Sequence, residues 1–507
     1  MSKRPFVDAA PSAAERDAGP RDVAVIDIGS NSVRLVQFRV EGRALWPVFN
    51  EKTMAGLGRG VGETGRLNPD GVKTSLRVLK RFSVLLDAKG VADRRAVATA
   101  AVRESRDGED FIARAEAATG MKIETLSGEE EGRRSALGVL NGVGEADGLT
   151  GDLGGSSLEL TALRGREIGA SISLPLGPLA VGTADLKRAK AAIDAELASV
   201  SKLVKKSGST FYAVGGAWRA FAHLALAVDE DYPLRLLHQF SLSARQVEQV
   251  AAFAMSQSEA SLASVPDISS RRAAGLPYAA LLLSRIMKKG RFEQVMISAN
   301  GLREGVVCAA NPDLVSEGDP LISGAEALAR SVAPEPDFGR ALEAWIEPAF
   351  AEETAVFGHR RDRALRAAAA RLADLGARMH PDHRAELTAT QILYAPIGGV
   401  THAERAFLAL TLHHRYAGKR SRDADCASRR LLDDDGETAA LKLGLALRLG
   451  AALSGRSASV LGAFSLKRSK STLALTVEAG GEALVVDRAL QRFEQLASIF
   501  GLEPKVM

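Results

Sequence analysis

The chain has little of the features that mark several classes of protein. Only 2 of its 507 residues are cysteine, Cys308 and Cys426, and neither stands beside other metal-ligating residues. The sequence therefore excludes a disulfide framework and a zinc site, and it is typical of a reducing cytoplasm. The formal net charge is only +4, which is too small to indicate nucleic-acid binding by itself. No apolar run approaches the ~20 residues of a membrane span.

The beginning of the chain also lacks a pattern that would target it elsewhere. Residues 1–21 are polar and rich in Ala, Asp, Arg and Pro, without the apolar core of a signal peptide. We predict a mobile tail there and a soluble, cytoplasmic protein with no membrane partner. The rest of the chain is ordinary in composition, with 46% apolar and 25% charged residues. It is too long for one hydrophobic core, so several domains are expected.

The same order of elements occurs twice along the first part of the chain. In each copy a short apolar strand ends at an aspartate, a tight turn follows, and two further strands precede alternating helices and strands. The expected strands are residues 23–27, 33–40 and 46–51 in the first copy and residues 149–152, 158–163 and 168–174 in the second. Two such meanders followed by alternating elements predict an α/β protein with duplicated halves.

These patterns divide the chain into four expected folded segments. We predict the first half over residues 22–141 and the second over residues 142–317. From residue 318 the sequence becomes rich in alanine and in helical spacing, which predicts a helical domain over residues 318–458. Alternating apolar residues near the end predict a small α+β segment over residues 459–507.

The strongest chemical signal is a pair of matching turns at equivalent places in the two halves. Glycine lets backbone N–H groups approach phosphate oxygens closely, and Ser or Asn side chains supply further donors. An aspartate repels phosphate directly, so its natural role beside such a turn is to hold Mg²⁺ against the phosphate. The sequence therefore predicts phosphate binding by both turns and metal binding by their aspartates. The turns are Asp27-Ile28-Gly29-Ser30-Asn31-Ser32 and Asp152-Leu153-Gly154-Gly155-Ser156-Ser157.

A third glycine turn lies further along the second half. Gly215 and Gly216 follow the expected strand over residues 211–214 and precede a helix. Backbone N–H groups at such a helix start suit a phosphate. The same glycines also suit a turn that packs closely against its neighbours. Both interpretations stay open, and Gly215 and Gly216 are candidate phosphate contacts.

An acidic cluster at an expected helix start supplies a candidate general base. Ser127 and Glu130 have the spacing of a capping box. Glu129 suits the positive end of the helix without any catalytic role. Glu131 is left over, rotated by about 100 degrees around the helix from Glu130. A carboxylate there has the chemistry to deprotonate a water that attacks a terminal phosphorus, although spacing alone favours a structural role.

These motifs together resemble those of a known family. The chain resembles the exopolyphosphatase and guanosine-pentaphosphate phosphohydrolase family, a branch of the ribonuclease-H/actin-like (ASKHA) fold. Residues 369–418 also resemble the HD-like accessory domain of that family. The segments that carry the resemblance are Asp27–Ser32, Thr99-Ala100-Ala101-Val102-Arg103, Ser127–Glu131, Asp152–Ser157, Ala213–Gly216 and Leu302-Arg303-Glu304-Gly305.

The resemblance implies roles for individual residues. Glu131 would be the general base and Arg103 would contact the phosphate chain. Asp152 and Glu159 would serve Mg²⁺. The implied activity is release of terminal orthophosphate from polyphosphate by attack of a Glu-activated water, and the implied assembly is a homodimer.

The sequence departs from the family pattern at two places. After the second aspartate, Ser156 stands where the family usually has glycine, and Leu158 stands where it has threonine. In the accessory domain the His-Asp metal pair of HD phosphohydrolases falls on Ala373 and Asp374, and alanine cannot ligate a metal. We therefore predict a degenerate HD-like domain. Its histidines are expected on the surface or in packing roles, namely His380, His383, His402, His413 and His414.

Other functions fit parts of the same pattern. Hydrolysis of guanosine pentaphosphate to the tetraphosphate is the same reaction on another terminal phosphate, and no motif separates the two substrates. We favour polyphosphate because the long C-terminal part leaves room for a basic channel. A sugar or acetate kinase of this fold would need an aspartate base and an adenosine pocket, and a nucleotide-gated scaffold would not need Glu131, Asp152 and Glu159 together.

Overall fold

The structure is a computed structural model that describes residues 19–316, 318–418, 426–478 and 481–507. The tail expected over residues 1–21 lies mostly outside the described residues, but its last residue, Arg21, is the first residue of a strand. The chain divides into two compact units, Met1–Gly318 and Asp319–Met507. No helix among the described residues is both long and apolar enough to cross a membrane.

The first unit begins with a five-stranded mixed sheet. Its strand order is β3-β2-β1-β4-β5, with β1, β2 and β3 antiparallel and β4 and β5 parallel to β1. Helices α3 (Pro69–Ala88) and α5 (Gly108–Thr119) cover this sheet, and α3 begins where the sequence predicts, because the Asn68 side chain accepts a hydrogen bond from the Gly71 N–H at 2.9 Å. The strands are β1 (Arg21–Ile28), β2 (Val33–Glu41), β3 (Ala44–Thr53), β4 (Asp93–Ala98) and β5 (Ile123–Thr125).

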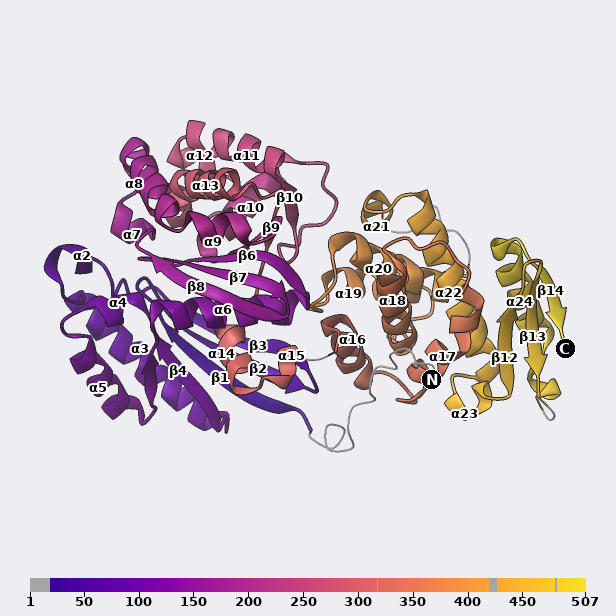
Figure 1. Ribbon diagram of the computed structural model, residues 1–507. Coiled ribbons are helices and arrows are strands. Elements are labelled where there is room, and N and C mark those ends of the chain that lie inside the picture. The colour runs from indigo at the N-terminus through magenta and orange to yellow at the C-terminus, as the bar shows by residue number, and fades with distance from the viewer. Residues whose placement is uncertain (1–18, 317, 419–425, 479–480) are drawn as a thin grey trace, which may run out of the picture. The chain divides into compact units, whose positions relative to one another are not determined.

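A second sheet repeats this arrangement and adds one edge strand. Its order is β10-β11-β9-β6-β7-β8, in which the antiparallel meander β6-β7-β8 corresponds to β1-β2-β3 and the parallel strands β9 and β11 correspond to β4 and β5. The strands are β6 (Ala146–Leu153), β7 (Leu158–Gly165), β8 (Glu167–Leu174), β9 (Thr210–Val214), β10 (Ser241–Ser243) and β11 (Gln294–Ile297). The predicted duplication of an α/β unit is confirmed, and Figure 1 shows the two copies within this unit.

Two helices hold the duplicated sheets together. Helix α6 (Gly128–Val143) contacts β6, β7 and β8, and α14 (Leu302–Ala310) lies along it (Figure 1). Although α14 follows β11, its buried face packs against the first sheet, with Val306 and Val307 in one cluster with Val23 and Val25. The contact requires Gly305, because a Cβ there would lie 1.6 Å from the Arg134 carbonyl oxygen. A Cβ at Gly138 would likewise lie 2.0 Å from the Gly301 carbonyl oxygen, so the close contact of α6 and α14 depends on small residues in both helices.

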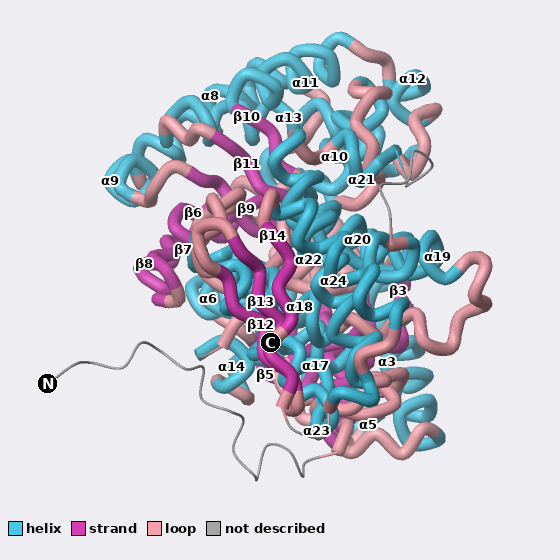
Figure 2. Tube along the Cα trace, turned by 90° about the vertical axis from the view of Figure 1, so that its right-hand side faces the viewer, coloured by secondary structure: helices cyan, strands magenta, loops and turns pink. Residues whose placement is uncertain are grey.

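The second unit is helical, with a small sheet near its end. Strands β12 (Phe464–Arg468) and β13 (Thr472–Val477) are antiparallel, and β14 (Glu503–Val506) lies parallel to β13 after the crossover helix α24 (Asp487–Phe500), as Figure 2 shows. Helices α20 and α22 form much of the core. The helices before this sheet are α16 (Pro320–Arg330), α17 (Phe338–Phe350), α18 (His359–Arg371), α19 (Arg384–Tyr394), α20 (His402–Ala417), α21 (Cys426–Arg430), α22 (Asp434–Ser454) and α23 (Ala458–Leu461).

The predicted histidines of this unit divide into two groups. His380 and His383 are exposed, whereas His402, His413 and His414 are buried on α20. The expected remnant of the metal pair, Asp374, is buried and receives a hydrogen bond from Arg415 at 3.4 Å. Within the described residues no group of three or more His, Cys, Asp or Glu side chains is arranged to hold a metal ion.

Candidate active site

The two predicted phosphate turns have the same backbone geometry and touch each other. The Gly29 N–H donates to the Ser32 carbonyl and the Gly154 N–H donates to the Ser157 carbonyl, both at 3.0 Å. Between the turns, the Ser156 hydroxyl donates to the Ser30 hydroxyl at 3.1 Å. Ser156 replaces a family glycine, so this departure from the pattern adds a hydrogen bond that joins the two halves.

The turns fix the register of the strands that flank them, and the register sets two rows of side chains. In the first half, Asp27 lies opposite Arg34, and Arg34 lies opposite Lys52 on β3. Directly opposite residues share one face of a sheet. A row that begins with an aspartate therefore continues with two cations.

The equivalent row in the second half has the opposite character. Asp152 lies opposite Glu159, and Glu159 lies opposite Ser173 on β8. At the two positions where the first half has cations, the second half thus has a carboxylate and a hydroxyl. The duplication has produced one basic and one acidic row at equivalent places.

The acidic row is buried and held by hydroxyl groups. The Ser135 hydroxyl on α6 donates to Asp152 Oδ2 at 2.6 Å, and the Ser173 hydroxyl donates to Glu159 Oε1 at 2.8 Å. Glu159 is only 1% exposed, and its other oxygen, Oε2, has no hydrogen-bond partner among the described residues. Burial, with the charge of Asp152 as a further cause, raises the pKa of Glu159 to about 7. Burial likewise raises the pKa of Asp152.

Glu131 lies at the start of α6, next to this acidic row. It is 7% exposed, and Arg103 on α4 (Ala100–Glu104) donates to Glu131 Oε2 at 3.2 Å and to the Leu126 carbonyl at 2.8 Å. Burial raises the pKa of Glu131 well above its usual value, and the charge of Glu159 adds to this effect while Arg103 opposes it. The predicted base and its predicted arginine are therefore paired.

The capping box predicted at this helix start is only half correct. The Ser127 hydroxyl accepts a hydrogen bond from the Glu130 N–H at 3.1 Å, as a capping box requires. The Glu130 carboxylate does not return to the Ser127 backbone. It accepts from Arg134 at 2.9 Å, because an arginine one helical turn further offers a charged donor.

A group of cations lies beside the two turns, and sequence analysis did not single it out. Lys52 and Arg34 from the basic row are joined by Arg219 on α10 (Gly216–Val228), Arg272 on α13 (Ser270–Gly290) and Arg303 on α14. We call these five residues the cation cluster. Arg303 pairs with Asp27 at 3.0 Å, whereas the side chains of Lys52, Arg219 and Arg272 have no hydrogen-bond or ion-pair partner among the described residues.

Residues of the cation cluster help to lower the pKa values of Lys52 and Arg34. Partial removal from water, together with four neighbouring guanidinium groups, lowers the pKa of Lys52 to about 8. Burial, with Arg303 and Arg219 close by, lowers the pKa of Arg34 to about 10. Mutual repulsion of this kind is relieved by a bound anion.

The glycines at the start of α10 serve two purposes. Gly215 has φ +116°, and a Cβ there would lie 2.7 Å from the Leu153 carbonyl oxygen, so Gly215 is required for close packing against the second turn. Nothing crowds Gly216 in this way, and the nearest atom to a Cβ there is Arg272 Nη2 at 4.0 Å. Gly216 therefore lies at the helix start beside the cation cluster, where its phosphate contact remains a prediction.

The donor set at this place fits a magnesium ion. Mg²⁺ is usually held by one or two carboxylates, and waters and substrate phosphates complete its octahedron. Asp152 and Glu159 supply such a pair, and the buried Glu159 Oε2 is an acceptor without a donor. Asp27 is also a predicted ligand, but its carboxylate already pairs with Arg303. The pair Asp152 and Glu159 therefore fits the ion better than Asp27 does.

The chain matches two family profiles that together cover most of its length. Residues 35–313 match the Ppx/GppA phosphatase family, and residues 321–506 match the C-terminal domain of exopolyphosphatases. Exopolyphosphatase 1 of Mycobacterium tuberculosis is 28% identical to the chain over 331 residues, which cover 62% of this chain and 95% of that protein.

Solved structures resemble the first part of the chain. A Ppx/GppA family member from Aquifex aeolicus aligns with a TM-score of 0.51 and 27% identity, over 58% of this chain and 98% of that structure. An exopolyphosphatase from Cytophaga hutchinsonii aligns with a TM-score of 0.53 and 21% identity, over 58% of this chain and 98% of that structure. The second of these similarities concerns the fold alone.

Proposed function

The chain belongs to the Ppx/GppA phosphatase family, and on this premise we propose that it is an exopolyphosphatase that releases terminal orthophosphate from inorganic polyphosphate. The observation that carries the proposal is the contrast between the two rows beside the touching phosphate turns. The basic row, in which Lys52 has no hydrogen-bond or ion-pair partner among the described residues, suits the anionic chain, and the buried carboxylates Asp152 and Glu159 suit the metal and the water at its end. The reaction is hydrolysis of a phosphoanhydride bond.

We propose that Glu131 removes a proton from the attacking water. The water oxygen forms a bond to the terminal phosphorus as the bridging P–O bond breaks, and the shortened chain leaves with the electron pair. A base works best when its pKa lies near the working pH, and burial raises the pKa of Glu131 in that direction. Arg103 donates to Oε2 of this carboxylate, which supports its proposed roles in orienting the base and contacting the reacting phosphate.

The phosphate turns position the anionic chain in this mechanism. Residues Gly29 to Ser32 and Gly154 to Ser157 are the proposed phosphate contacts, through backbone N–H groups other than those of Gly29 and Gly154, which close the turns, and Gly216 adds a helix start. Asp152 and Glu159 are the proposed ligands of Mg²⁺, with Asp27 beside them as an anchor for Arg303. When bound there, the ion would polarise a phosphoryl oxygen and offset negative charge that develops in the transition state.

Guanosine pentaphosphate remains the alternative substrate, and a direct comparison separates the two. We expect a higher kcat/KM for phosphate release from long-chain polyphosphate than from guanosine pentaphosphate at equal Mg²⁺. Release from the guanosine nucleotide alone would overturn the substrate assignment and keep the mechanism. Release from neither would overturn the proposed function and favour a kinase of this fold. The homodimer and the cytoplasmic location implied by the resemblance stay predictions.

Lys52 gives the proposed reaction a pH dependence of known sign. A lysine is charged below its pKa, so the cation cluster loses one charge as the pH rises through about 8. We therefore expect kcat/KM for polyphosphate to fall above about pH 8, because kcat/KM follows the free enzyme. The variant Lys52→Arg should retain its activity across that range, since arginine stays charged. An identical alkaline fall in wild type and Lys52→Arg would show that another group titrates.

A further inference from the structure

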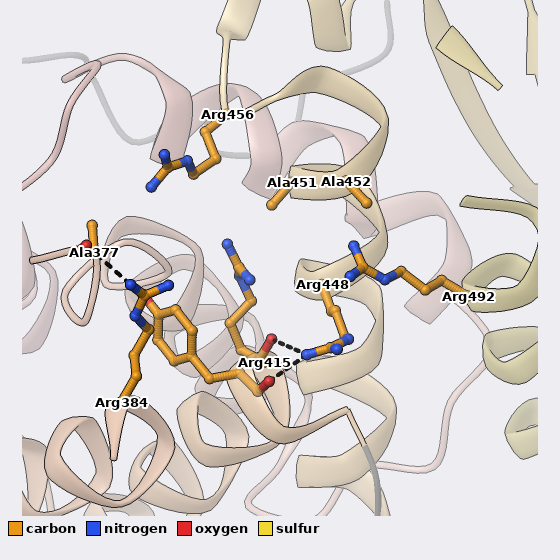
Figure 3. A pocket seen from close by; sticks show the side chains of 9 residues that line it. Ala377, Arg384, Arg415, Arg448, Ala451, Ala452, Arg456 and Arg492 are labelled. Atoms are coloured by element: carbon orange, nitrogen blue, oxygen red, sulfur yellow. Dashed lines mark hydrogen bonds between the residues drawn. The ribbon is translucent and has the colours of Figure 1, made fainter. Parts of the chain in front are cut away.

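A cavity of about 350 Å³ in the second unit is lined by five arginines. Arg384 comes from α19, Arg415 from α20, Arg448 from α22 and Arg492 from α24, and Arg456 follows the end of α22. Figure 3 shows these arginine side chains around one opening, and Tyr416 also lines the cavity. Among the described residues that line the cavity, none is a carboxylate. Four helices therefore bring like charges to one place.

Three of the arginines have structural partners. Arg448 donates to the Arg415 and Tyr416 carbonyls at the end of α20, and Arg384 donates to the Met379 carbonyl at 3.1 Å. Arg415 donates to the buried Asp374 at 3.4 Å. These bonds account for the burial of the three side chains, because buried polar groups are expected to be hydrogen-bonded.

The other two arginines have no such partners. The side chains of Arg456 and Arg492 make no hydrogen bond or ion pair with any residue that the structure describes. Arg456 also has φ +71°, a backbone conformation that is uncommon for a residue other than glycine. An uncommon backbone conformation therefore occurs at a residue whose charged side chain lines the cavity (Figure 3) and makes no hydrogen bond or ion pair with a described residue.

Repulsion among these groups is substantial in the absence of an anion. Burial and the charges of Arg492, Arg415 and Arg488 lower the pKa of Arg448 to about 10. Burial and Arg488 also lower the pKa of Arg492. Asp374, which contacts Arg415, carries one negative charge, and its Oδ2 atom has no hydrogen-bond partner among the described residues. The positive charge that remains around the cavity favours a ligand with several negative charges.

The cavity lies where the resemblance places the metal centre of an HD phosphohydrolase. Ala373 stands where the resemblance expects the histidine of the metal pair, and Asp374 accepts a hydrogen bond from Arg415, which lines the cavity. The Tyr416 hydroxyl donates to the Ala373 carbonyl at 2.9 Å. The place where the resemblance expects a metal pair therefore lies beside a cavity lined by cations.

We propose that this cavity binds a small anion with two or more phosphate groups, either inorganic oligophosphate or the phosphate end of a nucleotide. Guanidinium groups bind phosphate through charged hydrogen bonds, often two at a time. Five of them around one opening match an anion with several adjacent phosphates better than a single orthophosphate. The volume is at the small end of ligand pockets, which span roughly 300 to 1,000 Å³. Arg456 and Arg492 are the free donors that such an anion would engage.

Binding can be measured without turnover in the full-length chain. Calorimetric titration of the Glu131→Gln chain with inorganic triphosphate should show two classes of binding site. Adding Arg456→Gln and Arg492→Gln should weaken one class by tenfold or more and leave the other unchanged, since charged hydrogen bonds are lost at one place only. Glutamine keeps the backbone cost at position 456 the same. The exposed Arg330 on α16, which does not line the cavity, supplies the matched control Arg330→Gln.

The results of the titration distinguish a site in the cavity from its absence. A single class of site in the Glu131→Gln chain, or two classes that survive the double substitution, would overturn the proposal. If the double variant loses its fold in a thermal melt, Arg492→Gln alone makes the same test at one free side chain. Parallel titration with adenosine triphosphate separates the sources, because tighter binding of the nucleotide indicates a nucleotide ligand and tighter binding of inorganic triphosphate indicates an inorganic chain. A wild-type chain that releases no phosphate would overturn the proposed activity. The titration would still test the cavity, because it measures binding and not turnover.

Discussion

Replacing Glu131 by glutamine is expected to lower kcat for phosphate release from polyphosphate by about 10²- to 10⁴-fold, because a positioned general base contributes about that much. Glutamine keeps the size and an acceptor oxygen for Arg103, and it removes the negative charge together with the ability to take a proton. KM should change little, since the cation cluster and the phosphate turns are untouched. Steady-state kinetics with saturating Mg²⁺ measure both parameters.

Glu129 provides the matched control on the same helix turn. Its carboxylate is exposed and pairs with Arg133 at 3.6 Å, away from the acidic row. Glu129→Gln should therefore keep kcat within about twofold of wild type, as surface changes of this kind usually do. Equal losses in the two variants would indicate a general effect of charge at the start of α6 rather than base catalysis. A Glu131→Gln chain with full kcat would remove Glu131 from the mechanism.

The second large effect is expected from Asp152→Asn. The change removes one of the two proposed carboxylate ligands, and asparagine keeps its shape and can still accept from Ser135. We expect activity at fixed Mg²⁺ to fall by about 10²-fold or more, because changes in the support of a metal ligand already cost about 10- to 100-fold. The Mg²⁺ concentration for half-maximal activity should rise as well. A Mg²⁺ titration of the reaction rate measures both effects.

Asp147 supplies the control for this experiment. It lies on the same strand as Asp152 but is exposed and outside the acidic row. Asp147→Asn should leave the Mg²⁺ dependence as it is in wild type. If Asp152→Asn also keeps the wild-type dependence, Asp152 does not hold the ion.

Local sequence signals predicted the features that depend on short-range chemistry. The duplicated meanders follow from turns of four residues in which Gly29 and Gly154 have the same hydrogen bond. The cap of α3 at Asn68 follows from side-chain geometry within one turn of helix. The capping box at Ser127 failed in part because Glu130 had a competing partner one helical turn away, Arg134.

The basic row was available from the sequence in principle. Once the turn is placed, pairing of Asp27 with Arg34 follows by counting, as does pairing of Asp152 with Glu159. The remaining cations of the site could not be predicted from the sequence. Arg219, Arg272 and Arg303 come from three helices that only tertiary packing brings together. The contact of α14 with α6 at Gly305 is one such long-range event.

The arginine cavity of the second unit was even less predictable from the sequence. Its free arginines, Arg456 and Arg492, stand in segments with nothing to mark them as a pair. The sequence predicted the loss of the metal pair at Ala373 and gave no sign of what replaced it. Only the packing of α19, α20, α22 and α24 brings the five arginines around one cavity.

Hydrolysis of polyphosphate in water enriched in oxygen-18 tests the central claim most directly. If a water activated by Glu131 attacks the terminal phosphorus, the released orthophosphate carries the label from its first appearance and the shortened chain carries none. Mass spectrometry of early products distinguishes the two positions. Label in the new chain end, or release of internal fragments before orthophosphate, would contradict the proposed attack on the terminal phosphate.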